Sequence, residues 1–478
     1  MAKTPSPRSN FIKSGRRQQP PRLWGKDTLL IERMSQEGRG VARRAGKIVF
    51  VSAALQGEQV RVQCTAVKRD YDEADMIELA AASTAAPTRV QPECPVYHDC
   101  GGCSLQHWSL QGQQRHKQDR LLTMMRAISP ALELEPAIDS EPSGFRHRLR
   151  LLVTRAANRT YSFGLRRRHS HNAVSLAHCL VANASVNDLL DTLPKRLSTL
   201  PELQGLRELE IDSDSDNKLG LCFYFAAHPG EQVLSELAMS ILADPVVAIR
   251  VRLGNRKKSG KDESCGESEQ EDLNRWQELY TAGELCLRLA LPHSAADPAA
   301  EALRLGYLPG DFTQTHWGVN AALVARALDW LQPGTEDHAL DLFAGIGNFS
   351  LPLAQRVKTV HALEGDSAMS RRVSANAAHN DIHNIRAKTV NLMAESITLP
   401  RANIAIIDPP RAGASSVCAA LARSRLERLV YVSCHPATLL RDAKILQSAG
   451  FSLSKAAAVD MFPHTGHSEA IALFQRKS

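Results

Sequence analysis

A cysteine and a glutamate near the C-terminus have the side chains best suited to covalent chemistry. Cys434 lies in VYVSCHPATLLRD (430–442), where an apolar run meets a helical stretch. A helix N-terminus favours negative charge, and the thiolate is the reactive form of cysteine. Glu469, in MFPHTGHSEAIALF (461–474), immediately precedes the expected last strand and is suited to act as a base. Taken singly, the cysteine would be a buried structural residue and the glutamate a surface carboxylate.

A glycine-rich turn indicates a ligand site at the same sheet. In ALDLFAGIGNFS (339–350) a strand leads into Gly345 and Gly347, which let the backbone approach a ligand closely. Glu364 ends the next strand, where a carboxylate can accept hydrogen bonds from a ribose diol. The turn has no third glycine and no phosphate-binding lysine, which argues against a dinucleotide or ATP. S-adenosylmethionine carries no phosphate and fits better.

Two further strands are expected to end at the same edge, at Asn391 and at Asp408 in IIDPPR. The carboxyl ends of the strands are where doubly wound sheets bind ligands. One thiolate, one carboxylate and one methyl donor are the requirements for methylating C5 of uracil. The thiolate adds to C6, C5 then attacks the methyl group, and a base removes the C5 proton so that the cysteine can leave. The alternative is a sheet whose turns are only structural.

Four cysteines form a second candidate site. Cys94, Cys100 and Cys103 lie in CPVYHDCGGC with C-x5-C-x2-C spacing, and Cys179 follows in SLAHCLV. Four thiolates can hold zinc or an iron–sulfur cluster, and the uneven spacing with one distant ligand favours a cluster. Four ligands leave no open iron, so radical use of S-adenosylmethionine is not expected. We expect a structural site that ties two domains together.

Length and composition bound the architecture and the class of protein. The 478 residues are 43% hydrophobic and 23% charged, which predicts a soluble protein of two or three domains. No apolar run approaches the roughly 20 residues that span a bilayer. The net charge of +7 suits a polyanionic partner. Residues 1–23 are predicted to be a disordered basic arm without the apolar centre of a signal peptide, which favours a cytoplasmic protein with reduced cysteines.

The chain divides into three predicted domains. Residues 24–82 alternate apolar and polar residues between glycines, which predicts a small β-barrel with a basic, RNA-binding rim or a merely solvated one. Residues 90–305 predict a mixed α/β domain, in which the polar stretch 254–272 is expected to be a disordered insertion. Residues 306–478 alternate strands and helices, which predicts an α/β, doubly wound parallel sheet. Two closing strands after the last helix suggest an antiparallel edge.

These motifs resemble a known family. DLFAGIGNFS, IDPPRAGA, VSCHPATLLRD and HTGHSEA resemble the signature blocks of the bacterial RNA (uracil-5-)-methyltransferases, and the N-terminal barrel resembles a TRAM domain. The resemblance covers about residues 24–477 apart from the insertion. It implies a class I methyltransferase domain in which Cys434 is the nucleophile and Glu469 the base. It further implies that S-adenosylmethionine is held by Gln314, Phe343, Asn348, Glu364, Asn391 and Asp408. It also implies that a [4Fe-4S] cluster is held by Cys94, Cys100, Cys103 and Cys179.

The combination of barrel and cysteine set resembles one branch of the family, which modifies 23S rRNA. The resemblance therefore implies 23S rRNA as partner. A uridine inside folded RNA would have to be flipped out to be reached, at a cost of roughly a few kcal/mol. We also expect the protein to be a monomer. One departure is DPPR, which stands where some members have DPAR. We expect it to be tolerated because Asp408 and Arg411 remain.

Three other functions stay open at this point. The same chemistry could act on tRNA. Methylation of cytosine C5 or of an exocyclic amine is disfavoured, because Arg411 stands where amine methylases place an aromatic residue and Cys418 lies too far from the D-P-P turn. A non-catalytic iron–sulfur protein that binds RNA would require the ligand site to be vestigial.

Overall fold

The computed structural model describes residues 23–200, 202–241, 245–253, 276–291 and 302–476. Contacts divide the chain into two compact units, one formed by residues 1–35 and 39–87 and the other by residues 36–38 and 88–478. Most of the predicted basic arm and the whole of the 254–272 insertion lie outside the described residues. No helix among the described residues is long and apolar enough to cross a membrane.

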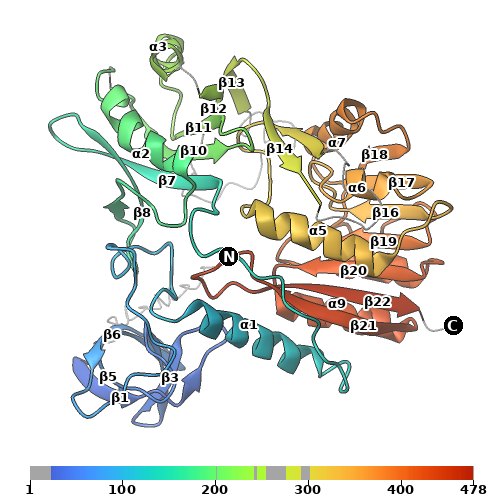
Figure 1. The fold of residues 1–478 in the computed structure, drawn as a ribbon. Helices are drawn as coiled ribbons and strands as arrows, with labels where there is room; N and C mark the ends of the chain where they lie inside the picture. Colours follow the sequence, from blue (N-terminus) through green and yellow to red (C-terminus); the bar gives the residue numbers. More distant parts are fainter. Residues whose placement is uncertain (1–22, 201, 242–244, 254–275, 292–301, 477–478) are drawn as a thin grey trace, which may run out of the picture. The chain divides into compact units, whose positions relative to one another are not determined.

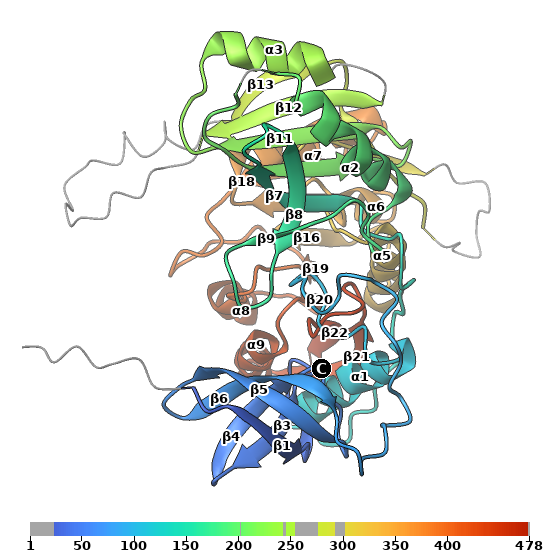
Figure 2. The ribbon, with the colours of Figure 1, turned by 90° about the vertical axis from the view of Figure 1, so that its left-hand side faces the viewer.

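The N-terminal unit is a six-stranded sheet with the order β1-β5-β6-β4-β3-β2. Its strands are β1 (Lys26–Leu30), β2 (Arg33–Met34), β3 (Gly40–Arg44), β4 (Lys47–Ser52), β5 (Gln59–Val67) and β6 (Tyr71–Leu79). Alternate residues of β4 and β5, among them Val49, Val51, Val60 and Val62, are fully buried in one core. The sheet curls on itself (Figure 2), as the sequence predicted for a small barrel.

A seven-stranded, mainly antiparallel sheet begins the second unit, in the order β13-β12-β11-β10-β7-β8-β9. Its strands are β7 (Arg148–Arg155), β8 (Tyr161–Arg166), β9 (Ala173–Ser175), β10 (Leu206–Ser213), β11 (Leu219–Phe225), β12 (Val246–Leu253) and β13 (Trp276–Thr281). Helices α2 (Ala184–Leu197) and α3 (Glu231–Ile241) share one apolar core with this sheet (Figure 1). The hairpin of β14 (Leu285–Leu289) and β15 (Leu303–Tyr307) then leads toward the C-terminal sheet.

The C-terminal sheet has the order β18-β17-β16-β19-β20-β22-β21. Its strands are β16 (His338–Leu342), β17 (Thr359–Glu364), β18 (Ile385–Thr389), β19 (Ile404–Ile407), β20 (Arg428–Ser433), β21 (Phe451–Val459) and β22 (Glu469–Arg476). The first five are parallel, whereas β22 runs antiparallel between β20 and β21. The doubly wound sheet and its antiparallel end match the prediction from the sequence.

Helices cover both faces of the C-terminal sheet. Residues of α5 (Trp317–Leu331), α6 (Ser350–Ala354) and α7 (Ser367–His379) belong to the core on one face. Residues of α8 (Ser415–Ala422) and α9 (Pro436–Ser448) belong to the core on the other face. This three-layer arrangement leaves the carboxyl edge of the sheet to carry the site.

Helix α1 (Leu110–Met125) joins this second face from a distant part of the sequence. Leu121 and Met125 are fully buried in the same core as α9 and β21, and Figure 1 shows α1 beside these elements. The predicted central domain, 90–305, thus supplies one helix of the methyltransferase layer. Residues 88–478 accordingly form a single compact unit by their contacts.

Candidate active site

The carboxyl ends of four parallel strands lie level at one edge of the C-terminal sheet. Leu342 at the end of β16 pairs with Leu363 on one side and with Ile407 on the other. Ile407 in turn pairs with Tyr431 of β20. Residues that follow these strands therefore meet at one edge, where α/β sheets bind their ligands.

Cys434 and Glu469 stand at adjacent strand ends on this edge. Ser433, the last residue of β20, pairs with Ala470 of the antiparallel β22. Cys434 directly follows Ser433, and Glu469 is the first residue of β22, which begins one position earlier than the sequence suggested. The register thus brings together two side chains that are 35 positions apart.

The Cys434 thiol is surrounded by groups that oppose its ionisation. Burial raises its pKa to about 11, and the carboxyl groups of Glu469 and Asp408 add to this, while Arg411 opposes it. Its sulfur lies 4.0 Å from the carbonyl oxygen of Pro409. The predicted stabilisation of a thiolate at the start of α9 is therefore outweighed by burial among carboxyl groups.

Glu469 is almost completely enclosed, with 6% of its surface exposed. Burial raises its pKa to about 8, and the neighbouring Asp408 raises it further. Lys117 and Arg411 act in the opposite direction. A carboxyl group whose pKa lies close to neutral pH can both accept and release a proton under working conditions.

The glycine turn after β16 is held by the end of β17. The backbone N–H of Gly345 donates to Oε2 of Glu364 over 2.9 Å, and the N–H of Phe343 donates to the Leu363 carbonyl over 3.0 Å. Phe343 and Gly345 have φ angles of 66° and 56°, in the left-handed region. A Cβ at Gly345 would meet no atom within 4 Å. The turn therefore leaves open space beside Phe343 and Glu364.

Asp408 and Gln314 are directly joined. The Gln314 amide Nε2 donates to Oδ2 of Asp408 over 3.2 Å. Burial raises the pKa of Asp408 to about 7, and the bond from Gln314 opposes that shift. Asp341, inside β16, is fully buried, and burial raises its pKa to about 7, with Asp408 and Glu364 adding to the effect. Asp341 was not among the predicted site residues, although a carboxylate within an apolar strand is a visible signal.

The two predicted asparagines have their amides engaged elsewhere. Asn348 exchanges two hydrogen bonds of 2.8 Å with Asn320 of α5. The Oδ1 atom of Asn391, an exposed residue beyond the end of β18, accepts the backbone N–H of Met393 over 3.0 Å. The structure thus brings Gln314, Phe343, Glu364, Asp408, Cys434 and Glu469 together at this edge, while Asn348 and Asn391 form hydrogen bonds with Asn320 and Met393.

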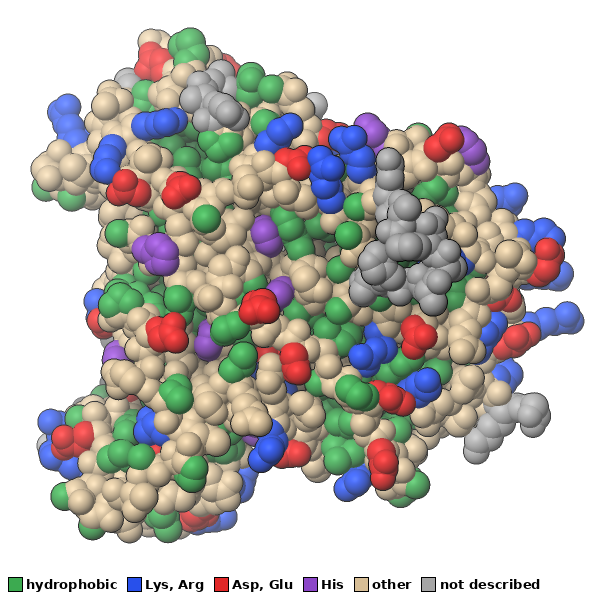
Figure 3. Space-filling model, in the orientation of Figure 1, with side chains coloured by type: hydrophobic (Ala, Val, Ile, Leu, Met, Phe, Trp, Pro, Cys, Tyr) green, Lys and Arg blue, Asp and Glu red, His purple; other side chains and the backbone are tan. Residues whose placement is uncertain are grey.

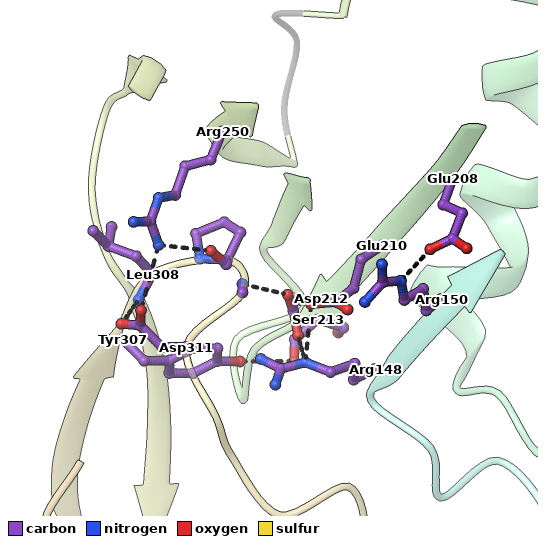
Figure 4. Close-up of polar contacts among 12 residues, drawn as sticks. Arg148, Arg150, Glu208, Glu210, Asp212, Ser213, Arg250, Tyr307, Leu308 and Asp311 are labelled. Carbon is purple, nitrogen blue, oxygen red and sulfur yellow. Dashed lines mark hydrogen bonds and ion pairs between the residues drawn. The ribbon is translucent and has the colours of Figure 1, made fainter. Parts of the chain in front are cut away.

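A charged network holds the turn 308–311 that precedes Gln314 (Figure 4). Arg250 of β12 donates to the Pro309 carbonyl over 2.8 Å and pairs with Asp311 at 3.3 Å. Asp311 also accepts the N–H of Leu308 over 2.9 Å. Asp212 of β10, paired with Arg148, accepts the N–H of Gly310 over 3.3 Å. The seven-stranded sheet therefore sets the conformation of the segment that delivers Gln314.

The four predicted cysteine ligands line one small cavity away from the sheet edge. Cys94, Cys100, Cys103 and Cys179 all contribute to its wall. The N–H of Gly102 donates to the sulfur of Cys100 over 3.4 Å. Among the described residues, no group of three His, Cys, Asp or Glu side chains is arranged to hold a single metal ion.

Comparisons with known proteins agree with these features. Residues 301–477 match the family model of the tRNA (Uracil-5-)-methyltransferases, and residues 28–77 match the TRAM domain. The chain is 35% identical to a protein of Chromohalobacter salexigens named 23S rRNA (uracil(1939)-C(5))-methyltransferase RlmD, over 94% of this chain and 89% of that protein. A protein of the same name from Shewanella baltica is 34% identical over 95% and 96%. The chain belongs to the RlmD family.

A solved structure supports the fold of this RlmD family member. The tRNA (uracil-54, C5)-methyltransferase of Pyrococcus abyssi, in complex with S-adenosyl-L-homocysteine, superposes with a TM-score of 0.68. The match covers 93% of this chain and 99% of that protein, with 21% sequence identity. The likeness establishes a class I methyltransferase fold and confirms the predicted fold class of the C-terminal domain.

Asp341→Asn is expected to flatten the pH dependence of stability. Because the folded-state pKa of Asp341 is raised, its contribution is fully present below the unfolded pKa, about 4, and is lost as the pH rises through about 7. Asparagine keeps an acceptor for the Ser350 hydroxyl but does not titrate. The free energy of unfolding should therefore fall more steeply for the wild type between about pH 4 and about pH 7, by up to about 1.4 kcal/mol per pH unit. Parallel curves would contradict this assignment.

Proposed function

We propose that this enzyme transfers the methyl group of S-adenosylmethionine to C5 of a uridine in 23S rRNA, the uridine that its relatives' names give as uracil 1939. The observation that carries the proposal is the placement of Cys434 and Glu469 at adjacent strand ends beside the glycine turn. Family membership over almost the whole chain supports the choice of RNA.

Cys434 begins the reaction. Its thiolate adds to C6 of the uracil, and the electron pair of the C5=C6 bond attacks the methyl carbon of the donor. The bond between that carbon and the sulfonium sulfur breaks, and the sulfur keeps the electron pair. A cationic donor also offsets the carboxyl groups that raise the pKa of the Cys434 thiol.

Glu469 completes the reaction. Its carboxylate removes the proton from C5, the electron pair of the C5–H bond reforms the C5=C6 bond, and the bond between C6 and the Cys434 sulfur breaks. A base whose pKa is raised to about 8 takes up this proton readily. The enclosed position of Glu469 keeps water from competing for it.

Cys434→Ala is expected to abolish both the covalent adduct and methyl transfer, because no other described cysteine stands at this edge. Glu469→Gln is expected to form the adduct but to slow its release by roughly 10²–10⁴-fold. We would incubate both variants and the wild type with S-adenosylmethionine and natural or 5-fluorouridine-substituted 23S rRNA. Denaturing gels measure the adduct, and nucleoside analysis measures 5-methyluridine.

The same assay contains its own controls. Fluorine at C5 cannot leave as a proton, so wild-type protein should be trapped on substituted 23S rRNA at Cys434. Adducts formed only with tRNA would support the proposed mechanism but would show that the substrate is tRNA and not 23S rRNA. Turnover by Cys434→Ala would rule out the covalent mechanism, and 5-methylcytidine as product would change the base.

S-adenosylmethionine would be held at the glycine turn by Gln314, Phe343, Glu364 and Asp408. The residues present fit this ligand. The open space at Gly345 accommodates a close-lying group, and Asp341, Asp408 and Glu469 present raised pKa values that a sulfonium and an ammonium group would lower. We propose that Asn348 and Asn391 also bind S-adenosylmethionine. Each would have to give up its present hydrogen bond, to Asn320 or to Met393, in order to do so.

Asp311→Asn is expected to raise the KM for S-adenosylmethionine about tenfold with a smaller change in kcat, because it loosens the turn before Gln314 and leaves Cys434 and Glu469 in place. Glu208→Gln is the matched control, since Glu208 pairs with Arg150 on the same sheet away from that turn (Figure 4). Steady-state kinetics with varied donor concentration measure both. An equal change in the two variants would contradict the role of the turn.

We further propose that the central domain holds a [4Fe-4S] cluster on Cys94, Cys100, Cys103 and Cys179. The thiols line one cavity, and burial together with neighbouring cysteines raises the pKa of Cys103 to about 11, a cost that metal ligation removes. A cluster attaches one thiolate to each of four irons, so its ligands stand farther apart than those of one zinc ion. The site would tie the 94–103 loop to the segment before α2.

Cys103→Ser is expected to lower iron and acid-labile sulfide in anaerobically purified protein and to bleach its visible absorption, because it removes one of four ligands. Cys286→Ser, at a cysteine outside this cavity, should leave all three unchanged. Metal and sulfide analysis with absorption spectroscopy measure the effect. If the wild-type protein contained zinc and no iron, the four cysteines would hold a zinc ion and the proposed cluster would be wrong.

RNA binding by the TRAM unit rests on fewer free charges than its sequence suggested. Several of its basic side chains are paired with acids of the same unit, namely Arg39 with Glu73, Arg44 with Asp27 and Lys47 with Asp72. Figure 3 likewise shows basic and acidic side chains interspersed on the visible face. RNA recognition is thus expected to depend on shape and on individual contacts more than on one basic block.

A monomeric state and a cytoplasmic location stay predictions.

A further inference from the structure

A buried ion pair lies close to the catalytic edge. The ammonium group of Lys117, in α1, is 2.6 Å from Oδ1 of Asp460, and only 4% of each side chain is exposed. The ammonium also donates to the Phe462 carbonyl over 2.9 Å. Ser140 donates to the other Asp460 oxygen over 2.9 Å. The pair therefore joins α1 to the loop between β21 and β22.

The register places this pair beside Glu469. Val459, the last residue of β21, pairs with Glu469, and Asp460 follows directly. A buried ion pair is a weak source of stability, because well-packed apolar residues in its place are often neutral or stabilising. Its position next to the general base therefore suggests a role for the charge itself.

Lys117 is the buried cation among the charges that act on Glu469. Those charges are Asp408, which follows β19, Lys117 of α1, and Arg411 of the loop after β19. Arg411 is exposed, so solvent screens its charge, whereas Lys117 is 3% exposed. The other titratable groups at this edge are Cys434, which follows β20, and Asp460, His464 and His467 of the β21–β22 loop.

Hydrogen bonds other than those of Lys117 also hold the loop between β21 and β22. The His464 carbonyl accepts the N–H groups of Ser104 and Leu105 over 2.8 and 2.9 Å. The N–H of His464 donates to Oε1 of Gln113 over 2.8 Å. These three bonds fix the loop independently, so removing the ammonium charge is expected to leave the backbone in place.

We propose that Lys117 is a positioning residue for the general base: held by Asp460 and Phe462, it supplies a buried positive charge that favours the ionised form of the Glu469 carboxylate, the form that removes the C5 proton. The inference rests on the proposed function. The proton passes from C5 to Glu469, the C5–H electron pair reforms C5=C6, and the bond from C6 to the Cys434 sulfur breaks. Lys117 itself exchanges no proton.

The test compares three variants in single-turnover reactions with natural 23S rRNA and S-adenosylmethionine. Lys117→Met/Asp460→Asn removes both charges and leaves no unpaired ion. Ser140→Ala removes the hydrogen bond to Asp460 and keeps both charges of the pair, and Lys444→Met, on the exposed face of α9, is the matched control for loss of a lysine. Samples quenched in detergent give the amounts of covalent adduct and released 5-methyluridine, and thermal unfolding checks the fold.

We expect the double variant to form the adduct at close to the wild-type rate and to release it about tenfold more slowly near neutral pH, so that adduct accumulates. Its release should recover as the pH rises, because a base with a higher pKa ionises at higher pH. Ser140→Ala and Lys444→Met should release product like the wild type.

Three outcomes would overturn the inference. The first is wild-type release by the double variant, and the second is an equal loss of adduct formation and release. The third is slow release by Ser140→Ala as well, in which both charges remain; it would make the pair merely structural and would decide the question even if the double variant did not fold. A wild type that forms neither adduct nor 5-methyluridine would instead overturn the proposed function, and this inference with it.

Discussion

The rest of the site depends on three carboxyl groups that are enclosed at one edge of the sheet. Burial raises the pKa of Asp341 and Asp408 to about 7 and that of Glu469 to about 8. Asp408 further raises the pKa values of Asp341 and Glu469, and Asp408 and Glu469 together raise the pKa of the Cys434 thiol. Such a cluster is costly unless a cation joins it or protons neutralise it. A methyl donor that carries a sulfonium group and an ammonium group meets this requirement, whereas a phosphate-bearing nucleotide would worsen it. The electrostatics thus select the class of ligand independently of the glycine turn.

Side chains from outside the C-terminal sheet hold this cluster of buried carboxyl groups in place. Gln314 donates to Asp408 and is delivered by a turn that Arg250 and Asp212 hold from the seven-stranded sheet. Lys117 approaches from α1 and ends on the loop before Glu469. Both supports come from residues outside the classical strand–helix alternation of the C-terminal layer. This explains why residues 88–478 form one compact unit and why the methyltransferase layer is completed by a helix from far earlier in the chain.

The parts of the site that could be predicted from the sequence are those encoded locally. A residue at the end of an apolar strand is visible in the sequence, and the positions of Glu364, Asp408 and Cys434 at strand ends were predicted in this way. The alternation of strands and helices also predicted the sheet. The ion pair of Lys117 and Asp460 joins residues that are 343 positions apart, and no local sequence pattern predicts it. The direction of the Cys434 pKa was misjudged for a related reason, since a helix N-terminus is local whereas the burial and the carboxyl groups that outweigh it come from tertiary packing.

The cysteine loop and the proposed general base, Glu469, share one structural support. The backbone N–H groups of Ser104 and Leu105, which directly follow the last cysteine of the loop, bind the carbonyl of His464, in the loop that precedes Glu469. Gln113 of α1 donates to the Leu105 carbonyl over 3.1 Å and accepts the His464 N–H, and Lys117 lies one helical turn further along the same helix. Ligation of the four cysteines would therefore stiffen the start of α1, and with it the cation beside Glu469. Under our proposal, a [4Fe-4S] cluster on these cysteines would influence proton removal by Glu469 through packing alone, without entering the chemistry.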